Sequence, residues 1–334
     1  MNNYEWLEID RIEKIKSIVN QYGEENFYLS FSGGKDSTIL HYLVDLALPE
    51  NKIPRVFINT GIEYNDIVKY VKDLAEKDDR FVILKPTKSI KKVLDEYGYP
   101  FKSKQHSHIL NVYQNNKNII DINNTDLANA PKGAKSVIKY VNGIRENKEK
   151  EIYKMSNFSC PNVLKYQFTK DFDIKISDKC CLKLMKEPVA KWAKENNKSI
   201  VMTGMRKEEG GNRSNLNCIV TDKENNVIKF HPLSVVNTEF EDWFLARHDI
   251  SLCKLYYSPF NFTRTGCKGC PFALELQEQL DKMVEFLPAE ERQCEMIWQP
   301  VYQEYRKLNY RLNKSGNIKE RQLTIYDFSE EERL

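Results

Sequence analysis

The most regular feature of the chain is a set of short apolar runs that alternate with helical patterns. Four runs of strand length lie at 27–31, 55–59, 81–85 and 199–203, and turn or helix signals follow each of them. Apolar strands that alternate with helices are typical of α/β proteins, in which right-handed crossovers join parallel strands. We therefore predict a mostly parallel sheet flanked by helices, with ligands bound at the carboxyl ends of its strands.

Two amphipathic segments extend this pattern at the ends of the chain. Residues 4–24 place apolar side chains near helical spacing, and residues 272–313 are helical in pattern and rich in aromatic side chains. We predict one domain over residues 1–275 and a helical C-terminal cap over residues 276–334. The charged tail from about residue 314 is expected to be mobile.

A polar segment at 103–160 interrupts the alternation. It is rich in Asn and Lys and offers few core residues, which favours a solvated helical or flexible insertion. The alternative is a substrate lid, because the segment leads directly to Cys160 and the first cysteine pair. His106 and His108 also lie here, and we expect them to be exposed and inert.

The turn after the first predicted strand carries the chemistry of a phosphate site. The sequence Ser-Gly-Gly-Lys-Asp-Ser at 32–37 leads from a strand directly into an apolar helix. Free N–H groups and the helix dipole at such a turn hold phosphate oxygens, and glycines let the backbone approach the anion. The spacing of a Walker loop is absent. The predicted binding residues of this turn are Ser30, Ser32, Gly33, Gly34, Lys35, Asp36 and Ser37.

Composition is consistent with an enzyme that works in the cytoplasm. The chain has 334 residues, of which 41% are hydrophobic and 30% charged, enough for a sizeable core and a hydrated surface. The net charge of +3 is too small to indicate nucleic-acid binding by itself. No apolar run is long enough to span a bilayer, and residues 1–6 do not begin a secretory signal, so we expect a cytoplasmic location and no membrane partner.

Four of the eight cysteines form two close pairs, Cys180-Cys181 and Cys267-x-x-Cys270. Disulfides are rare in a reducing compartment, whereas metal ligation by cysteine pairs is common there. Four thiolates hold either a [4Fe–4S] cluster or a structural zinc ion, and spacing alone does not separate the two. The other four cysteines stand alone and are interpreted as core residues.

Five ordered elements between about residues 25 and 275 resemble the phosphoadenosine phosphosulfate (PAPS) reductase family of the PP-loop ATP pyrophosphatase superfamily. They are the turn at 32–37, Thr-Gly-Ile-Glu at 60–63, Cys-Cys at 180–181 with its following Pro188, Thr-Gly-Met-Arg at 203–206, and Arg-Thr-Gly-Cys-Lys-Gly-Cys at 264–270. The segment 231–243 is similar to a further family region, with its Trp displaced. This resemblance implies a Rossmann-like fold of the adenine nucleotide alpha hydrolase type.

The resemblance also implies roles for particular residues. Lys35, Asp36 and Arg206 are expected to act in catalysis, and Cys180, Cys181, Cys267 and Cys270 to ligate a [4Fe–4S] cluster, with zinc as the alternative occupant. Further nucleotide contacts are expected from Thr60, Gly61, Glu63, Gly204, Arg206 and Arg213. ATP and Mg²⁺ are the other implied cofactors.

Two departures from the reductases direct the functional hypothesis. The phosphate loop is intact, as in family members that split ATP, and residues 295–334 contain no cysteine of the kind that the reductases use as nucleophile. We therefore predict an enzyme that converts ATP to AMP and pyrophosphate and supports sulfur transfer, similar to iron–sulfur proteins of DNA phosphorothioation. The alternatives are a sulfonucleotide reductase that releases sulfite and a nucleotide- or redox-sensing binding protein. Implied partners are an adenine nucleotide, a sulfur donor such as a cysteine desulfurase, a nucleic-acid acceptor and a second copy in a homodimer.

Overall fold

The computed structural model describes residues 3–124, 127–131, 133–146, 152–154 and 159–313. They fall into two compact units, each made of two chain segments. The first unit comprises residues 1–89 and 183–268, and the second comprises residues 90–182 and 269–334. The predicted mobile tail from residue 314 lies outside the described residues.

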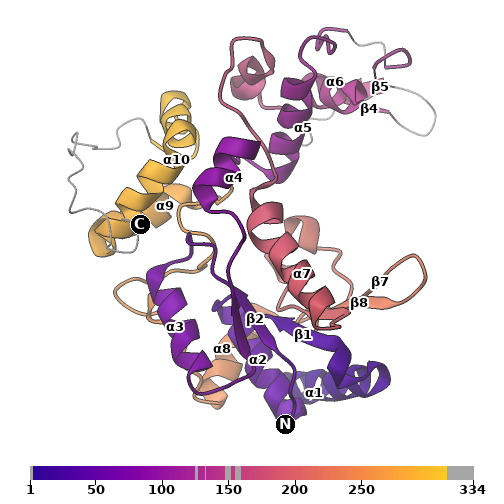
Figure 1. Ribbon diagram of the computed structural model, residues 1–334, viewed down its shortest axis with the longest axis vertical. Helices are drawn as coiled ribbons and strands as arrows, with labels where there is room; N and C mark the ends of the chain where they lie inside the picture. The colour runs from indigo at the N-terminus through magenta and orange to yellow at the C-terminus, as the bar shows by residue number, and fades with distance from the viewer. Residues whose placement is uncertain (1–2, 125–126, 132, 147–151, 155–158, 314–334) are drawn as a thin grey trace. The chain divides into compact units, whose positions relative to one another are not determined.

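The first unit is built on a six-stranded sheet with the order β3-β2-β1-β6-β8-β7. Figure 1 labels the strands β1, β2, β7 and β8 of this sheet. All neighbouring strands pair in parallel except β7 and β8, which pair antiparallel at one edge. The strands are β1 (Phe27–Ser30), β2 (Arg55–Ile58), β3 (Phe81–Leu84), β6 (Ile200–Met202), β7 (Ile219–Thr221) and β8 (Val227–Phe230). The predicted mostly parallel sheet is confirmed, and the pair β7 and β8 was not predicted.

Helices flank this sheet, as predicted. They are α1 (Asn3–Tyr22), α2 (Lys35–Ala47), α3 (Asn65–Ala75), α7 (Glu187–Glu195) and α8 (Thr238–Arg247), with the short helices η1 (Glu24–Asn26), η5 (Lys207–Glu209), η6 (Gly211–Arg213) and η7 (Lys254–Tyr256). On one face, α7 packs Trp192 edge-on against Tyr28 of β1, with ring centroids 5.7 Å apart. Phe31 points to the opposite face, because alternate strand side chains do, and its ring contacts His41 of α2.

The second unit is mainly helical. Its elements are α4 (Ile90–Tyr97), α5 (Lys104–Asn115), α6 (Ala134–Asn142), the hairpin β4 (Ile144–Glu146) and β5 (Ile152–Lys154), η3 (Asn162–Phe168), α9 (Leu276–Phe286) and α10 (Pro288–Leu308). The helical turn η4 (Leu182–Lys186) begins where this unit meets the first in sequence. The two helices α9 and α10 confirm the predicted C-terminal helices.

The expectation of few core residues at 103–160 is wrong. Helices α5 and α6 contribute buried side chains that pack with η3, among them Leu110, Tyr113, Val137 and Ile138. The expected exposure of His106 is also wrong, because this side chain is fully buried and its ring nitrogens contact Tyr140 Oη at 3.0 Å and Gln167 Oε1 at 2.8 Å. Burial lowers the pKa of His106 to about 4, so the ring is neutral and structural.

Candidate functional site

The loop between β1 and α2 forms the floor of the candidate site in the first unit. Gly33 has a φ of 72°, a conformation that side chains rarely adopt, and a Cβ there would lie 2.9 Å from Ile67 Cγ2. Gly34 is constrained by space instead, because a Cβ would lie 3.2 Å from both Ser32 Oγ and Tyr256 Oη. Both glycines of the predicted loop are therefore required by the local geometry.

Serine hydroxyls hold this loop in shape. The Ser32 and Ser37 hydroxyls contact each other at 3.0 Å, and Ser37 Oγ donates to the Gly34 carbonyl at 3.0 Å. The Gly34 N–H donates to Ser32 Oγ at 3.3 Å. Ser30 ends β1 with an exposed side chain. The arrangement gathers hydroxyl and amide groups at the start of α2, which is a favourable place for an anion.

Lys35 begins α2 and is held by two carboxylates of α8. Its Nζ lies 3.2 Å from Glu241 Oε2 and 3.3 Å from Asp242 Oδ1. Helix α8 is fixed at its start by Asn237, whose side chain accepts the Phe240 N–H at 2.9 Å. The predicted loop lysine is thus restrained at the loop by acidic side chains of α8.

Arg206 connects the loop after β6 to the same cluster. Its Nε donates to Asp36 Oδ1 at 2.8 Å and lies 3.1 Å from Glu241 Oε1, and its Nη1 donates to Glu208 Oε2 at 2.6 Å. Gly204 allows this approach, because a Cβ there would lie 2.8 Å from the backbone oxygen of Asp36. The structure therefore brings Lys35, Asp36 and Arg206 into one charged cluster.

Glu241 is the residue of this cluster that sequence reasoning did not assign. Its side chain is fully buried, and neither oxygen makes a well-aligned hydrogen bond, although Lys35 and Arg206 lie in ion-pair range. Burial, followed by the proximity of Asp36, raises the pKa of Glu241 to about 8, while the charges of Arg206 and Lys35 oppose the shift. The segment 231–243, which contains Glu241, was identified by its similarity to the family, but nothing in the sequence indicated that this glutamate is buried.

The remaining predicted nucleotide residues lie in two turns of the first unit. Glu63 accepts the Thr60 N–H at 2.8 Å and the Thr60 hydroxyl at 2.7 Å, so it caps the turn after β2. Gly61 has a φ of 86° in that turn, with open space around it. Arg213 and Arg264 both pair with Glu209, whose side chain is nearly buried. Glu63 and Arg213 thus make their contacts with other residues of the protein.

Three of the four predicted metal ligands, Cys180, Cys181 and Cys270, belong to the second unit and lie near enough to influence one another's pKa. Burial, followed by the charges of Cys181 and Cys270, raises the pKa of Cys180, and burial raises that of Cys270 to about 11. Lys104 is close enough to oppose both shifts. Cys267 precedes Cys270 by three residues and belongs to the first unit. Gathered thiols suit soft cations, because a bound metal replaces their protons and stabilises the thiolates.

The loop that carries Cys270 is fixed by α10 and the residues after it. Tyr302 and Tyr305 donate to the carbonyls of Gly269 and Pro271, and Arg311 donates to the Pro271 carbonyl at 2.7 Å. Gly269 has a φ of 59°, and a Cβ there would collide with Cys294 and Tyr302. The aromatic residues of the C-terminal helices therefore position this cysteine.

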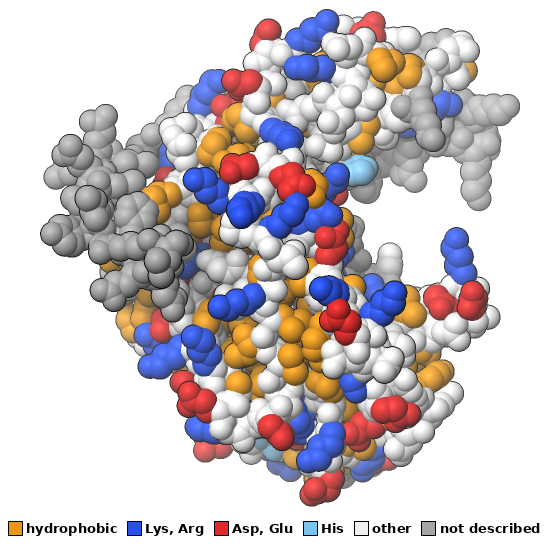
Figure 2. Space-filling view, in the orientation of Figure 1, with side chains coloured by type: hydrophobic (Ala, Val, Ile, Leu, Met, Phe, Trp, Pro, Cys, Tyr) orange, Lys and Arg blue, Asp and Glu red, His pale blue; other side chains and the backbone are white. Residues whose placement is uncertain are grey.

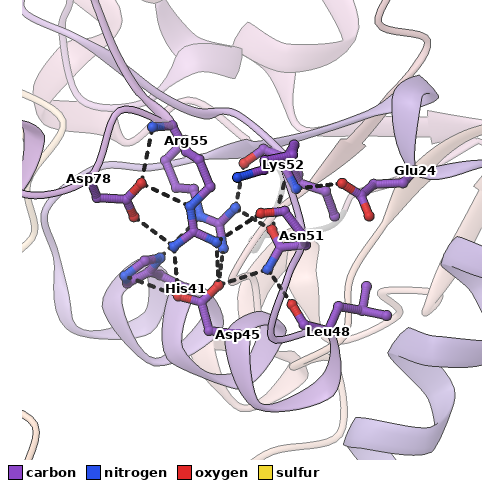
Figure 3. A network of polar contacts seen from close by, with 10 residues as sticks. Glu24, His41, Asp45, Leu48, Asn51, Lys52, Arg55 and Asp78 are labelled. Atoms are coloured by element: carbon purple, nitrogen blue, oxygen red, sulfur yellow. Dashed lines mark hydrogen bonds and ion pairs between the residues drawn. The ribbon is translucent and has the colours of Figure 1, made fainter.

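A second group with metal-ligand chemistry lies in the first unit, where donor atoms of His41, Asp45 and Asp78 lie within 4.8 Å of one another (Figure 3). Two arginines already occupy its acceptors. Arg55 donates to His41 Nδ1 at 3.0 Å and to Asp45 Oδ1 at 2.6 Å, and Arg80 donates to Asp45 and Asp78. Burial and Arg55 lower the pKa of His41 to about 4. This group is a buried ion-pair network that fastens α2 to β2 rather than a metal site.

The comparisons with known proteins identify the family. A family model of the phosphoadenosine phosphosulfate reductase domain matches residues 26–273, well over half of the chain. The chain belongs to the phosphoadenosine phosphosulfate reductase family. The matched range contains the phosphate loop, the Arg206 loop and both cysteine pairs, so the family resemblance predicted from these motifs is confirmed.

The relatives of this family member are distant. An uncharacterized protein of Methanocaldococcus jannaschii is 34% identical over 103 residues, which span 28% of this chain and 25% of that protein. A PAPS reductase of Candida auris, solved with phosphate, has a TM-score of 0.40 and 12% identity, covering 77% of this chain and 93% of that one. The NH3-dependent NAD synthetase of Campylobacter jejuni has a TM-score of 0.37 and 13% identity, covering 90% and 95%. Within the described residues, no helix has the length and apolar character to cross a membrane.

Proposed function

We propose that this chain is an adenylating enzyme that converts ATP to AMP and pyrophosphate and supports iron–sulfur-dependent sulfur transfer to an acceptor. The observation that carries the proposal is the intact Ser-Gly-Gly-Lys-Asp-Ser loop at the start of α2, with Lys35 held 3.2 Å from a buried carboxylate. A loop that binds only an already adenylated nucleotide has no need of this lysine. An enzyme that releases pyrophosphate does need it.

The loop supports binding of the β- and γ-phosphates of ATP. Its amides and hydroxyls already converge, and the dipole of α2 adds positive potential at the same point. Lys35 is 20% exposed and has a flexible stem, so its ammonium group can move from Glu241 and Asp242 to a phosphate oxygen. The polyphosphate would thus replace the two carboxylates as its partner.

In the chemical step, an oxygen of the acceptor attacks the α-phosphorus, and the bond from that phosphorus to the bridging oxygen of the β-phosphate breaks. Pyrophosphate leaves with the bonding electrons, and AMP is joined to the acceptor. Lys35 and the loop donors stabilise the charge that develops on the leaving phosphates. Asp36 would hold Mg²⁺ here, because a carboxylate oxygen beside bound phosphates is its preferred ligand type.

The thiol cluster supports the second half of the reaction. A sulfur nucleophile displaces AMP from the adenylated acceptor, which forms the carbon–sulfur or phosphorus–sulfur bond and releases AMP. The persulfide of a cysteine desulfurase would supply that sulfur: its terminal sulfur displaces AMP and leaves the acceptor in a mixed disulfide with the desulfurase cysteine. An external thiol reductant then attacks the desulfurase sulfur, which breaks the S–S bond, releases the acceptor thiolate and oxidises that thiol to a disulfide. Cys180, Cys181, Cys267 and Cys270 would hold a [4Fe–4S] cluster, with zinc as the alternative. When bound, the cluster would supply a site for holding sulfide and a charge that tunes the adenylate's surroundings.

The surface allows two classes of acceptor, a nucleic acid and a small molecule. On the face that Figure 2 shows, the described Lys and Arg side chains are interspersed with Asp and Glu. A nucleic-acid groove is expected to concentrate one sign of charge. The ATP site therefore carries the proposal, and activity assays with each class of acceptor distinguish between the two.

The test is AMP and pyrophosphate formation by the anaerobically purified chain with ATP, Mg²⁺ and either tRNA, duplex DNA or a small-molecule extract. Lys35→Met is expected to lower the rate at least 100-fold, because it removes the loop cation but keeps its stem. Lys52→Met is the matched control, since Lys52 is exposed. Equal rates for both variants and the native chain would rule out the role of the loop.

The family membership favours one alternative, a sulfonucleotide reductase. That enzyme would release sulfite from PAPS or its 5′-phosphosulfate relative with thioredoxin as reductant, in the absence of ATP. Sulfite release without ATP would replace our proposal. Nucleotide binding with neither product would indicate a sensing protein instead.

A further inference from the structure

The Tyr256 hydroxyl occupies a position at the phosphate loop that an anion would be expected to take. The Lys35 N–H, at the first residue of α2, donates to Tyr256 Oη at 3.1 Å. The first amides of a helix lack partners within the helix, and these are the donors that phosphate groups use. A phenol oxygen therefore satisfies an amide of the kind that binds phosphate.

Tyr256 stands close to the rest of the loop as well. A Cβ on Gly34 would lie 3.2 Å from Tyr256 Oη and 3.2 Å from Ser32 Oγ, so the two hydroxyls border the same small space. The short helix that carries Tyr256 is restrained by Lys254, whose Nζ lies 2.8 Å from Asp66 Oδ1 at the start of α3. The Tyr256 hydroxyl is therefore fixed in its position beside the phosphate loop.

On its other side, Tyr256 contacts the segment that leads to the CxxC pair. Tyr256 Oη lies 2.7 Å from Thr265 Oγ1, and Thr265 precedes Cys267 by two residues. The Lys268 N–H donates to the Ile62 carbonyl at 2.7 Å, so this segment is also anchored beyond the cysteine. One hydroxyl thus joins the phosphate loop to the start of the cysteine-bearing segment, and all of these contacts lie within the first unit.

Hydrogen-bond chemistry determines what happens when the loop fills. A phenol has one donor and two acceptor sites, and phosphate oxygens only accept. In this structure Tyr256 accepts from Lys35, and its own hydroxyl hydrogen can be donated to Thr265. Once phosphate takes the Lys35 amide, the phenol can gain a bond only by donating to the phosphate, and Thr265 then becomes the donor to Tyr256.

We infer that Tyr256 is a phosphate-binding residue that reverses its hydrogen bond with Thr265 when the loop is occupied, and so couples nucleotide binding to the segment that carries Cys267. The inference rests on the proposed nucleotide site. The inference extends the proposed function, because it couples ATP binding at the phosphate loop to the segment that carries a cysteine of the sulfur-transfer site. Burial raises the pKa of Tyr256 above its ordinary value of 10, which keeps the hydroxyl available as a donor at neutral pH.

The test measures binding of inorganic pyrophosphate and of ATP with Mg²⁺ by calorimetry, which needs no acceptor. Tyr256→Phe is expected to weaken both ligands about 3- to 10-fold, the usual range for the loss of one hydrogen bond. Tyr257→Phe is the matched control, because Tyr257 Oη accepts the Leu252 N–H at 2.9 Å and does not touch the loop. Its affinity is expected to stay within about 2-fold of the native value.

The coupling between the phosphate loop and the cysteine-bearing segment is measured separately. The measurement is hydrogen–deuterium exchange of the backbone at 260–270 with and without saturating pyrophosphate. The native chain and Tyr257→Phe are expected to change exchange there on binding, whereas Tyr256→Phe and Thr265→Val are not. Thr265→Val keeps the phenol and so provides a second variant if Tyr256→Phe folds poorly. Unchanged affinity and an unchanged exchange response in Tyr256→Phe would overturn the inference. Pyrophosphate binding without AMP formation would count against the proposed function alone.

Discussion

Arg206 donates from Nε to Asp36 Oδ1 at 2.8 Å and lies 3.1 Å from Glu241 Oε1. One guanidinium therefore joins the loop after β6, the first turn of α2 and helix α8. The side chain is 10% exposed, so these carboxylates take up most of its bonding capacity. Arg206 is arranged to hold the phosphate loop and its neighbours in place before any nucleotide binds.

Arg206→Lys is expected to impair both stability and turnover. A lysine keeps the charge but cannot hold Asp36 and Glu208 at once through a planar fork. We expect a loss of about 1–3 kcal/mol in the free energy of unfolding and a rate of AMP formation at least 10-fold lower. Thermal melts and AMP assays check this. Arg247→Lys is the control, because Arg247 is half-exposed on α8, and a loss as large in that variant would contradict a special role for Arg206.

Gly204→Ala tests how closely the two loops approach. A Cβ at Gly204 would lie 2.8 Å from the Asp36 oxygen and 2.9 Å from its carbonyl carbon, both backbone atoms that cannot rotate away. We expect a loss of about 1–3 kcal/mol in the free energy of unfolding, measured by denaturant titration. Gly266→Ala is the matched control, since a Cβ there meets nothing within 4 Å. Equal stability of the two variants would show that the loops separate at little cost.

The first unit was largely predictable because its strands are continuous apolar runs. Such runs at 27–31, 55–59, 81–85 and 199–203 correspond to β1, β2, β3 and β6, of which β1, β2 and β6 lie inside the sheet and β3 lies at one edge. The strands β7 and β8 escaped notice because polar residues interrupt them. Thr221 is the exposed residue of β7, and in β8 the exposed Lys229 lies between Ile228 and the buried Phe230, so neither strand is a continuous apolar run.

The second unit was harder to predict because its buried positions are diluted by polar ones. In α5, His106, Ile109, Leu110 and Tyr113 occupy one helical face at spacings of three and four. The other positions are mostly polar: Lys104, Gln105, Ser107, His108, Asn111, Gln114 and Asn115. The polar composition therefore favoured a solvated insertion, whereas the helical spacing of the apolar residues indicated a packed amphipathic helix. The same limit applies to the site, where Glu241 and Tyr256 reach the loop only through tertiary packing.

Glu241→Gln is expected to change how stability depends on pH. The pKa of Glu241 is raised to about 8 from 4.5, so between these values the folded chain binds a proton that the unfolded chain does not. This group therefore makes the folded state less stable as pH rises from about 5 to 8, with a slope of at most about 1.4 kcal/mol per pH unit. Glutamine cannot titrate. As pH rises from about 5 to 8, the free energy of unfolding of the native chain should fall relative to that of Glu241→Gln. A difference between the two that stays constant over this pH range would contradict the raised pKa.

Asp45→Asn tests the assignment of the network in Figure 3 as structural. The substitution leaves Arg55, which has no exposed surface, without its carboxylate. We expect a loss of about 1–3 kcal/mol in the free energy of unfolding, because Asp45 is 29% exposed and Arg55 keeps its hydrogen bonds to Asn51 and Ile53. The melting temperature of the native chain should not respond to EDTA through this group. A chelator effect on the native chain that Asp45→Asn abolishes would instead indicate a metal ion at His41, Asp45 and Asp78.

Cys180→Ser and Cys270→Ser test the thiol cluster through metal content rather than activity. These cysteines lie close enough to influence each other's pKa, and a serine hydroxyl is a poor ligand for soft cations. Anaerobically purified native chain is expected to contain iron and acid-labile sulfide and to absorb in the visible range. Each variant should lose most of its iron and melt at a lower temperature, because metal binding stabilises the folded state. Cys218→Ser is the control, since Cys218 is half-buried and belongs to the first unit, whereas Cys180 and Cys270 belong to the second. The native chain would instead be colourless and contain stoichiometric zinc if the metal is zinc. Loss of that zinc in the same two variants would confirm the cysteines as ligands and rule out the iron–sulfur cluster.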